Sequence, residues 1–310
     1  MGCATTDLDD LDLYSYLYSL LKQIPEGCVT TYGDLASALG DPIAARAVGY
    51  MLSINEDPDT IPCYKVVRSD GMVGNYTHPL GQAEKLRRLV GDGISISSRK
   101  IDDFQRVRFT DFKTEYPLNS IRMEQERMRE HIDLNDDYSD SIVSAVDVSY
   151  DDFNGYASIV TDDGNERTVD NFVSQSRFPY IPGYLSAKEF KFIKALYRRD
   201  SFLLVDGNGI LHPRKMGLAT YSGIKLDQAS IGIAKSMFYD STVPGYVKRN
   251  GEDLGYAVNR HMVISPGNRI SMKSAVSEAM KIGGGKYPDI LKAAHYSSVK
   301  LRKTYATDLK

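Results

Sequence analysis

The sequence predicts two domains of different fold class. The first is mainly α-helical and contains a helix-turn-helix, and the second is an α/β domain built on a mixed sheet. The chain has 310 residues, which is enough for two domains that each bury a core. Its apolar residues keep a helical spacing from residue 8 to about 97, whereas strand-like and helix-like runs alternate from about residue 104 onward. We therefore expect domains at 8–97 and 104–310, with a linker at 98–110.

The first domain carries start and stop signals for three helices. The run LDLYSYLYSLLKQI has apolar or aromatic residues at helical spacing and ends before a proline. Thr31 is placed to cap a second helix, with Asp34 three residues later and Gly40 as its stop. Asp41 and Pro42 then occupy the cap and the first position of a third helix. Two short helices joined by this tight turn indicate a helix-turn-helix.

The second helix of this pair is rich in small residues, and two interpretations stay open. Ala44, Ala45, Ala47 and Gly49 would let the backbone approach a DNA groove, with Arg46 among them. The same small residues would also let two helices pack closely against each other.

Strand-like and helix-like runs alternate along the second domain. SIVSAVDVSY and DDFNGYASIV predict two strands of a hairpin with an Asn-Gly turn, and RTVDNFVSQSRF predicts a third strand. SFLLVDGNG, ASIGIAKS and RHMVISPG predict three more. Helices are expected in NSIRMEQERMREHIDLNDD, SAKEFKFIKALYRR, SMKSAVSEAMKI and PDILKAAHYSSVKLRK. This order indicates a mixed sheet flanked by helices.

Composition and charge restrict the class of partner. The hydrophobic fraction is 42%, and no apolar run approaches the length of a membrane span, so we expect no membrane partner. The acidic start, MGCATTDLDDLDL, lacks the basic flank and apolar stretch of a signal peptide, which predicts a cytoplasmic protein. Three cysteines without a CxxC spacing argue against a disulfide framework or a zinc site. A net charge of −3 argues against uniform attraction to nucleic acid and permits local basic patches, such as the one that follows Cys63.

Three acidic residues of the second domain occupy unusual positions. Asp147 interrupts an apolar strand, Asp206 ends another, and Glu189 opens the helix between them. A buried carboxylate is costly unless it is paired or bound to a metal, so acids that meet at strand ends indicate a Mg²⁺ site. Each acid alone also fits a structural role, as an edge-strand charge, a turn residue, or part of a capping box with Ser186.

Six motifs in the second domain, in this order, resemble endonuclease V. They are VDVSY (146–150), FPYIPGYLSAKE (178–189), LLVDGNGILHPRKMGLA (203–219), IGIAKS (231–236), ISPGNRIS (264–271) and PDILKAAH (288–295). The resemblance covers residues 104–310. It implies a ribonuclease H-like fold and a Mg²⁺-dependent endonuclease that cleaves DNA on the 3′ side of deaminated purines, chiefly hypoxanthine.

The resemblance also implies roles for single residues. Asp147, Asp206 and Glu189 would form the metal site, while Glu189 and His295 would position the attacking water. Lys235 would neutralise charge that develops on the phosphate.

A second group of residues would recognise the lesion. PYIP (179–182) matches the segment that fills the gap when a base is rotated out, and Tyr180 with two stiff prolines suits that task. The chain departs from the family before the last histidine, where Ile290, Leu291 and Lys292 replace a proline and a Thr-Arg pair. The other residues that the resemblance places around the flipped base are Gly183, Gly207, Gly209 and His212.

The first domain resembles the C-terminal, DNA-binding half of O6-alkylguanine-DNA alkyltransferase. The motifs are IPEGCVTTYGDLASALG, AARAVG, IPCYKVVRSDGMVGNY and LRRLVGDG, and the resemblance covers residues 8–97. In that family the cysteine after Ile-Pro takes the alkyl group from a flipped guanine in an irreversible transfer. Cys63 occupies that position.

The alkyltransferase motifs are complete except beside the cysteine. The resemblance implies that Tyr32 rotates the phosphate of the base, Arg46 fills the vacated stack, Asn55 orders the site and Tyr76 binds the lesion. The usual Pro-Cys-His-Arg reads Pro-Cys-Tyr-Lys here, so Tyr64 replaces the histidine that relays a proton. Tyrosine is a poorer base, because its ordinary pKa is near 10. A cation such as Lys65 would have to supply part of the lost activation, with Asp92 in place of the usual glutamate.

Together the two resemblances predict a DNA-repair protein that nicks hypoxanthine-containing DNA and transfers an alkyl group from O6-alkylguanine to Cys63. The alternative is a nuclease joined to a lesion-binding adaptor that has no catalytic role. We expect damaged single- or double-stranded DNA as the partner, RNA as a second candidate substrate, Mg²⁺ as the cofactor, and a monomer.

Overall fold

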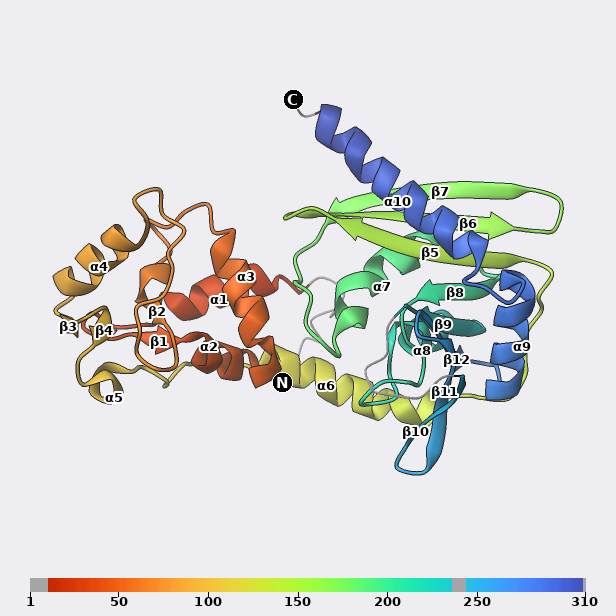
Figure 1. Cartoon of the computed structure of the whole chain (residues 1–310), viewed down its shortest axis with the longest axis horizontal. Coiled ribbons are helices and arrows are strands. Elements are labelled where there is room, and N and C mark those ends of the chain that lie inside the picture. Colours follow the sequence, from red (N-terminus) through yellow and green to blue (C-terminus); the bar gives the residue numbers. More distant parts are fainter. Residues whose placement is uncertain (1–10, 236–243, 309–310) are drawn as a thin grey trace, which may run out of the picture. The chain divides into compact units, whose positions relative to one another are not determined.

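The structure is a computed structural model that describes residues 11–235 and 244–308, and its contacts divide the chain into two compact units (Figure 1). Unit 1 consists of the described residues up to Arg122 together with Arg177–Pro182. Unit 2 consists of Met123–Ser176 and the described residues of Gly183–Lys310. Residues 98–122 thus pack with unit 1, and Phe104 joins its core. None of the described helices is long and apolar enough to cross a bilayer.

Unit 1 is mainly α-helical, as the sequence predicts. Its helices are α1 (Leu13–Leu21), α2 (Tyr32–Leu39), α3 (Ala45–Ser53), α4 (Gly81–Gly91) and α5 (Phe104–Val107), and α6 (Pro117–Met128) continues into unit 2. Two short strand pairs accompany them, β1 (Thr30–Thr31) parallel to β2 (Val66–Val67), and β3 (Ile96–Ser97) antiparallel to β4 (Lys100–Ile101).

The predicted helix signals act as expected in α2 and α3. The Thr31 hydroxyl accepts a hydrogen bond from the Asp34 amide, and the Asp34 carboxylate accepts one from the Thr31 amide, which completes a capping box. α2 ends at Gly40, whose φ of 106° favours glycine. Asp41 caps the 3₁₀ turn Pro42–Ala44 that leads into α3. The helix-turn-helix is therefore confirmed.

The small residues of α3 mainly serve helix packing. Ala44 and Ala47 are buried, and a side chain at Gly49 would meet the ring of Tyr32 at the start of α2. Arg46 and Tyr50 remain exposed on the opposite face of α3. The close approach thus involves α2, while the polar face of α3 is open to solvent.

Unit 2 is built on an eight-stranded mixed sheet, which confirms the predicted α/β class. The strands lie in the order β10-β11-β12-β9-β8-β5-β6-β7, and β5, β8 and β9 run parallel to one another. The strands are β5 (Val143–Tyr150), β6 (Asn154–Asp162), β7 (Arg167–Gln175), β8 (Phe202–Asp206), β9 (Ser230–Ala234), β10 (Gly245–Arg249), β11 (Glu252–Asn259) and β12 (Met262–Asn268).

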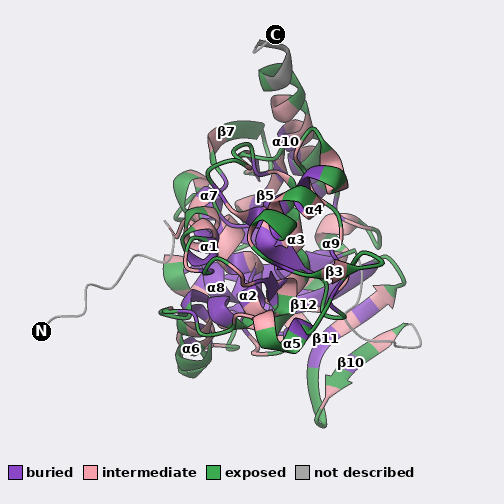
Figure 2. Cartoon of the chain, turned by 90° about the vertical axis from the view of Figure 1, so that its left-hand side faces the viewer, coloured by how far each residue is buried: buried purple, intermediate pink, exposed green. Residues whose placement is uncertain are grey.

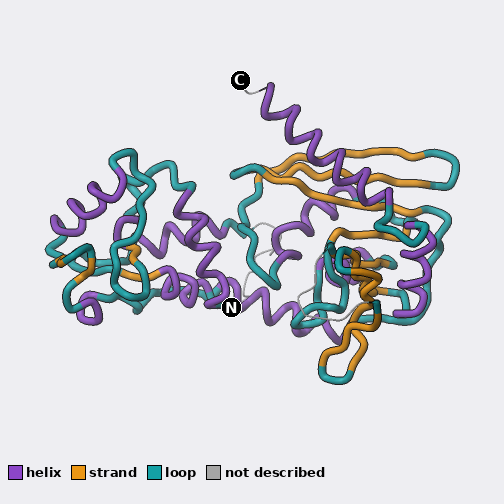
Figure 3. The backbone as a smooth tube through the Cα atoms, in the orientation of Figure 1, coloured by secondary structure: helices purple, strands orange, loops and turns teal. Residues whose placement is uncertain are grey.

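Helices flank this sheet (Figure 3). They are α7 (Leu185–Leu196), α8 (Leu218–Leu226), α9 (Met272–Gly283) and α10 (Asp289–Asp308), with a 3₁₀ turn at Arg129–His131 after α6. α10 contacts β5, β6 and β7, while α8 and α9 contact β9 and β12. The central strands β9 and β12 are buried throughout, and the edge strands β7 and β10 are largely exposed (Figure 2).

Two hairpins differ from the sequence prediction. The turn between β5 and β6 is formed by Asp151, whose carboxylate accepts two backbone amides, while Asn154 and Gly155 lie inside β6. Gly155 is required there because a Cβ atom would overlap the Phe192 ring of α7. The hairpin β10–β11 was not predicted, although its residues Asn250 and Gly251, both with positive φ, form a two-residue turn of the kind that an Asn-Gly pair favours.

Candidate active sites of the two units

Cys63 of unit 1 begins the 3₁₀ turn Cys63–Lys65, directly before β2. β2 pairs in parallel with β1, whose last residue is followed at once by Tyr32 of α2. This pairing fixes the cysteine turn beside the start of α2. The Cys63 side chain is 5% exposed, and its sulfur accepts a hydrogen bond from the Asn55 side-chain amide at 3.3 Å.

Burial and nearby charge act in opposite directions on the Cys63 thiol. Burial raises its pKa, while the Asn55 hydrogen bond and the positive charges of Lys85 and Arg88 favour the thiolate. Lys85 is almost completely buried, and its ammonium donates to the carbonyls of Val66 at 2.6 Å and Asn75 at 3.1 Å. Burial lowers the pKa of Lys85 to about 8. A lysine on an amphipathic helix usually faces solvent, so the sequence alone predicts no site role for Lys85.

Tyr64 and Lys65 both bind Asp92. The Tyr64 hydroxyl donates to Asp92 Oδ2 at 3.0 Å, and Lys65 Nζ lies 3.2 Å from the same oxygen. Lys65 also donates to the carbonyls of Ile24 and Pro25. Burial and the Asp92 carboxylate raise the pKa of Tyr64 above its ordinary value. Tyr64 is thus a hydrogen-bond donor, and Lys65 forms an ion pair with Asp92.

The other predicted lesion-binding residues of unit 1 separate into two groups. Tyr32 and Tyr76 are close enough to Cys63 for its thiolate charge to act on them. Burial and this charge raise the pKa of both phenols, that of Tyr76 to about 12. The Tyr76 hydroxyl donates to the Pro58 carbonyl, and its ring stacks on His78 with 5.7 Å between centroids. Arg46 is exposed on α3. The structure thus gathers Tyr32, Asn55, Tyr64 and Tyr76 around the cysteine turn.

In unit 2, Asp147 and Asp206 occupy equivalent positions on adjacent parallel strands. Val146 of β5 is the register partner of Val205 of β8, and each acid follows its valine by one residue. Side chains at equivalent positions of neighbouring strands point to the same face of a sheet. The strand pairing therefore brings the two carboxylates together.

The Asp147 carboxylate is held by α10. His295 Nδ1 lies 3.2 Å from Asp147 Oδ2, and the Ser298 hydroxyl donates to the same oxygen at 2.6 Å. His295 was expected from the sequence. Ser298 was not, because it lies one helical turn beyond the motif and only the packing of α10 on β5 brings it to Asp147.

Glu189 projects from α7 into the same group of carboxylates. Burial raises the pKa of Glu189 to about 8, the Asp147 and Asp206 carboxylates act in the same direction, and Lys188 acts against them. The capping-box interpretation is wrong, because α7 begins at Leu185 and buried Ser186 accepts a hydrogen bond from Gln125 at 3.1 Å. Glu189 is therefore free of a capping role.

Lys235 and Tyr287 complete this group. The Lys235 ammonium forms an ion pair with Asp206, and it lies 5.2 Å from the centroid of the Tyr287 ring. The Tyr287 hydroxyl is buried near the Asp206 carboxylate. Burial, together with the charges of Asp206 and Asp147, raises the pKa of Tyr287.

The carboxylate group of unit 2 fits a divalent cation. Burial is the main cause of the raised pKa of Glu189, and the negative charges of Asp147 and Asp206 add to it, so a cation among these carboxyl groups would be stabilised. Oxygen ligands of this kind suit Mg²⁺. Within residues 11–235 and 244–308, no three His, Cys, Asp or Glu side chains already converge as a metal site. Asp147, Asp206 and Glu189 are the residues that would hold such a cation.

His212 holds the loop that begins α7. Its Nδ1 accepts from the backbone amides of Arg214 and Met216, so Nε2 carries the proton and donates to the Gly183 carbonyl at 3.2 Å. Burial, with the charge of Arg214, lowers the pKa of His212 to about 3, which keeps the imidazole neutral. Gln125 and Arg214 donate to the same Gly183 carbonyl. The position of Gly183, with φ of 81°, is therefore fixed from three directions.

The remaining predicted lesion residues differ in their surroundings. Gly209 lies so close to β12 that a Cβ atom would overlap the Pro266 backbone, whereas Gly207 has only ordinary contacts. Tyr180 belongs to the segment Arg177–Pro182 of unit 1 and is 56% exposed. Within unit 1, the Arg177 carbonyl accepts a hydrogen bond from the Leu13 amide at 3.0 Å.

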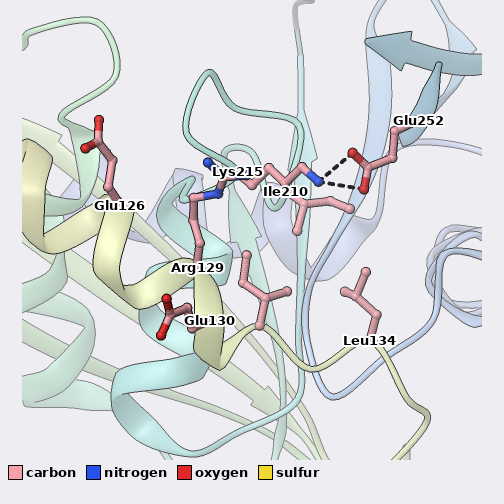
Figure 4. Close-up of a pocket in the computed structure, with 8 residues that line it drawn as sticks. Glu126, Arg129, Glu130, Leu134, Ile210, Lys215 and Glu252 are labelled. Carbon is pink, nitrogen blue, oxygen red and sulfur yellow. Dashed lines mark hydrogen bonds and ion pairs between the residues drawn. The ribbon is translucent and has the colours of Figure 1, made fainter. Parts of the chain in front are cut away.

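A cavity of about 410 Å³ lies elsewhere in unit 2 (Figure 4). Apolar residues and charges of both signs line it, and Lys215 and Glu252 form an ion pair at its edge. None of the predicted site residues lines this cavity. It has no counterpart in the sequence analysis and adds no group to the carboxylate cluster.

Two different protein families match the two parts of the chain. Residues 126–296 match the family model of endonuclease V, and residues 12–94 match that of the 6-O-methylguanine DNA methyltransferase DNA binding domain. A bifunctional methyltransferase/endonuclease of Thermoplasma volcanium is 50% identical over 291 residues, which are 94% of this chain and 91% of that protein. One of Picrophilus torridus is 50% identical over 297 residues, 96% of this chain and 99% of that protein.

A solved structure is similar to the nuclease part. It is endonuclease V of Ciona intestinalis in complex with a 24mer DNA that contains an inosine followed by a ribo-adenosine. The match covers 61% of this chain and 98% of that one, with 21% sequence identity and a TM-score of 0.53. At this identity the likeness establishes the fold alone.

Proposed function

Because the chain belongs to the family of bifunctional methyltransferase/endonucleases, we propose that it repairs DNA with two separate active sites. Unit 2 nicks DNA on the 3′ side of deaminated purines, chiefly hypoxanthine, and depends on Mg²⁺. Unit 1 binds O6-alkylguanine and transfers its alkyl group to Cys63. The inosine in the Ciona intestinalis complex supports the choice of lesion for unit 2.

The pairing of Asp147 with Asp206 is the observation that carries the nuclease proposal. Asp147, Asp206 and Glu189 would hold Mg²⁺, which when bound supplies a Lewis acid for the scissile phosphate. His295 and Ser298 fix the orientation of the Asp147 carboxylate. Lys235 provides a positive charge for the phosphate once a cation takes over the neutralisation of Asp206.

The hydrogen bond from Asn55 to the Cys63 sulfur carries the alkyl-transfer proposal. The thiol loses its proton to solvent, a bond forms between sulfur and the alkyl carbon, and the bond from that carbon to guanine O6 breaks. Guanine then takes up a proton. Asn55 and the buried charge of Lys85 stabilise the thiolate, which is the reactive form.

A lesion-binding adaptor is the second candidate for unit 1, and one observation favours it. Tyr64 occupies the position of the usual base, but its hydroxyl donates to Asp92 and its pKa is raised. Asn55, which contacts the sulfur, is an amide and cannot accept the proton. In the adaptor, unit 1 would bind the lesion without chemistry.

Two assays test these proposals. Strands of DNA and RNA that contain hypoxanthine are incubated with the protein, with Mg²⁺ or with a chelator, and the products are separated on a gel. We expect nicks in the DNA only with Mg²⁺; cleavage in the chelator overturns the metal proposal, and cleavage of RNA alone overturns the choice of DNA. DNA with tritiated O6-methylguanine should label the protein to a one-to-one limit, and binding without label over hours would establish the adaptor.

A further inference from the structure

One face of α10 has the features of a nucleic-acid contact. Lys292, Tyr296, Lys300 and Lys303 are all exposed, and they follow one another at intervals of three or four residues. At about 100° per residue, these four positions fall within an arc of about 80° on the helix surface. We call this set the α10 stripe. Lys292 forms an ion pair with Asp289, which lies one turn earlier on the same face, so the net positive charge of the stripe comes from Lys300 and Lys303, in a protein whose net charge is −3.

The inner face of α10 explains why these residues point outward. Ile290, Leu291 and Ala294 are buried in the core that α10 shares with α9 and the sheet, and Ser298 is buried against Asp147. Arg302 is used structurally, because it donates to the Tyr150 carbonyl at 2.7 Å. The C-terminal part of α10 extends beyond the strands in two perpendicular views (Figures 1 and 2).

Tyr296 distinguishes the stripe from an ordinary solvated face. It is 71% exposed, the largest exposed fraction among the large hydrophobic side chains of the described residues. It lies between two lysines of the stripe and directly follows His295, whose imidazole contacts Asp147 of the carboxylate cluster. An exposed aromatic ring between cations is the combination that single strands bind, by base stacking and by backbone attraction.

We propose that the α10 stripe binds the phosphate backbone of the nucleic-acid strand that flanks the nicked bond. This inference rests on the proposed nuclease function of unit 2. Lys292 to Lys303 span about 16 Å of helix, which corresponds to about five nucleotides of one strand. The lysines attract the phosphates, and Tyr296 stacks on a base or sugar.

Binding measurements at several salt concentrations test the stripe. Fluorescence anisotropy is recorded without divalent cation on a hypoxanthine duplex with long flanks, for the wild type and for Lys300→Gln/Lys303→Gln. We expect the variant to bind more weakly and the slope of log affinity against log salt to fall by about two, since each lost phosphate contact removes about 0.9. Tyr296→Ser should weaken binding with an unchanged slope. The matched control is Lys273→Gln/Lys281→Gln on α9, which should leave both quantities as in the wild type.

Trimmed substrates locate the contact. Duplexes shortened on either flank are compared, and the affinity difference between wild type and Lys300→Gln/Lys303→Gln should vanish on the duplex that lacks the contacted flank. Equal slopes for variant and wild type, or the same loss on every trimmed duplex, overturn the proposal. If the wild type nicks DNA and the stripe variants leave affinity and salt dependence unchanged, the stripe proposal is wrong and the nuclease proposal stands. A wild type that binds with the expected slopes but never nicks contradicts the nuclease proposal alone.

Discussion

Single charged residues affect the reactive groups of both units. In unit 1 the charge of Lys85 favours the thiolate of Cys63, and in unit 2 the ammonium of Lys235 pairs with Asp206. Cys63 was found through a motif, because the sequence Ile-Pro-Cys is local. Lys85 and Ser298 were not found, because their significance depends on partners that lie 19 and 151 residues away in the sequence. A long-range contact of this kind leaves no local pattern, so only the folded chain reveals it.

Alkyl transfer should accelerate as the pH rises. The reactive form is the thiolate, and burial raises the pKa of Cys63, so only a small fraction is ionised at neutral pH. Below the pKa the rate should climb about tenfold per pH unit and should level off only above the ordinary cysteine value of about 8.5. Single-turnover transfer of tritiated methyl, measured between neutral and alkaline pH, checks this. A plateau near neutral pH would show that the thiol is activated in spite of its burial.

Replacement of Lys85 should slow transfer at neutral pH but not at high pH. Its charge favours the thiolate, so Lys85→Met should raise the pKa of Cys63. Ultraviolet absorbance of the thiolate, recorded in a Cys3→Ser/Cys28→Ser background, measures that pKa directly. Lys85→Arg is the matched control that retains the charge. A variant that is slow at every pH would point to a lost contact with Val66 and Asn75 instead of a lost charge.

Lys235 should oppose cation binding in the absence of DNA. Its ammonium pairs with Asp206 Oδ2 and so competes with a cation for that oxygen. Lys235→Gln should therefore bind Mn²⁺ more tightly than the wild type in calorimetry, while its nicking rate on hypoxanthine DNA falls. Asp206→Asn removes a proposed ligand, so this variant should lose both Mn²⁺ binding and nicking. Weaker Mn²⁺ binding by Lys235→Gln would contradict the competition.

Elements of unit 2 with a strong apolar period were predicted from the sequence, whereas α8, β10 and β11 were not. The core strands and α7, α9 and α10 follow from periodicity alone. The β10–β11 hairpin lies at the sheet edge and is mostly polar, so its Asn-Gly turn was the only sequence signal. α8 contains Gly223, where a Cβ atom would overlap the Ser230 hydroxyl of β9. This close packing favours a residue that weakens the local helix signal.

One added methyl group between β6 and α7 should lower the stability of unit 2. Gly155→Ala would place a methyl against the Phe192 ring, so we expect unit 2 to lose about 1–3 kcal/mol of unfolding free energy. Phe192→Leu in the same chain should restore part of this loss, because it vacates the space. Gly283→Ala, whose nearest neighbour Pro288 is at an ordinary distance, is the control. Urea unfolding followed by circular dichroism gives the values, and equal stability of Gly155→Ala and wild type would refute the packing argument.

At the scale of the whole molecule, each activity should depend on its own unit. Asp147→Ala should abolish nicking and leave the transfer of methyl to Cys63 unchanged, because Asp147 lies in unit 2 and Cys63 in unit 1. Cys63→Ala should have the opposite effect. Gel and label assays on the same preparations measure both activities. Loss of both activities in a folded variant would show that the sites are coupled.

The assignment of Arg177–Pro182 to unit 1 has a consequence for how such a protein can be inherited. The chain contributes to unit 1 twice, so a gene cut once between the codons of residues 122 and 123 would leave this short segment with the nuclease half. That half would lack Leu13, whose amide bonds the Arg177 carbonyl, and the cut would also divide α6. Separation into two genes at this point would therefore break that hydrogen bond and divide α6, whereas the joined gene keeps both.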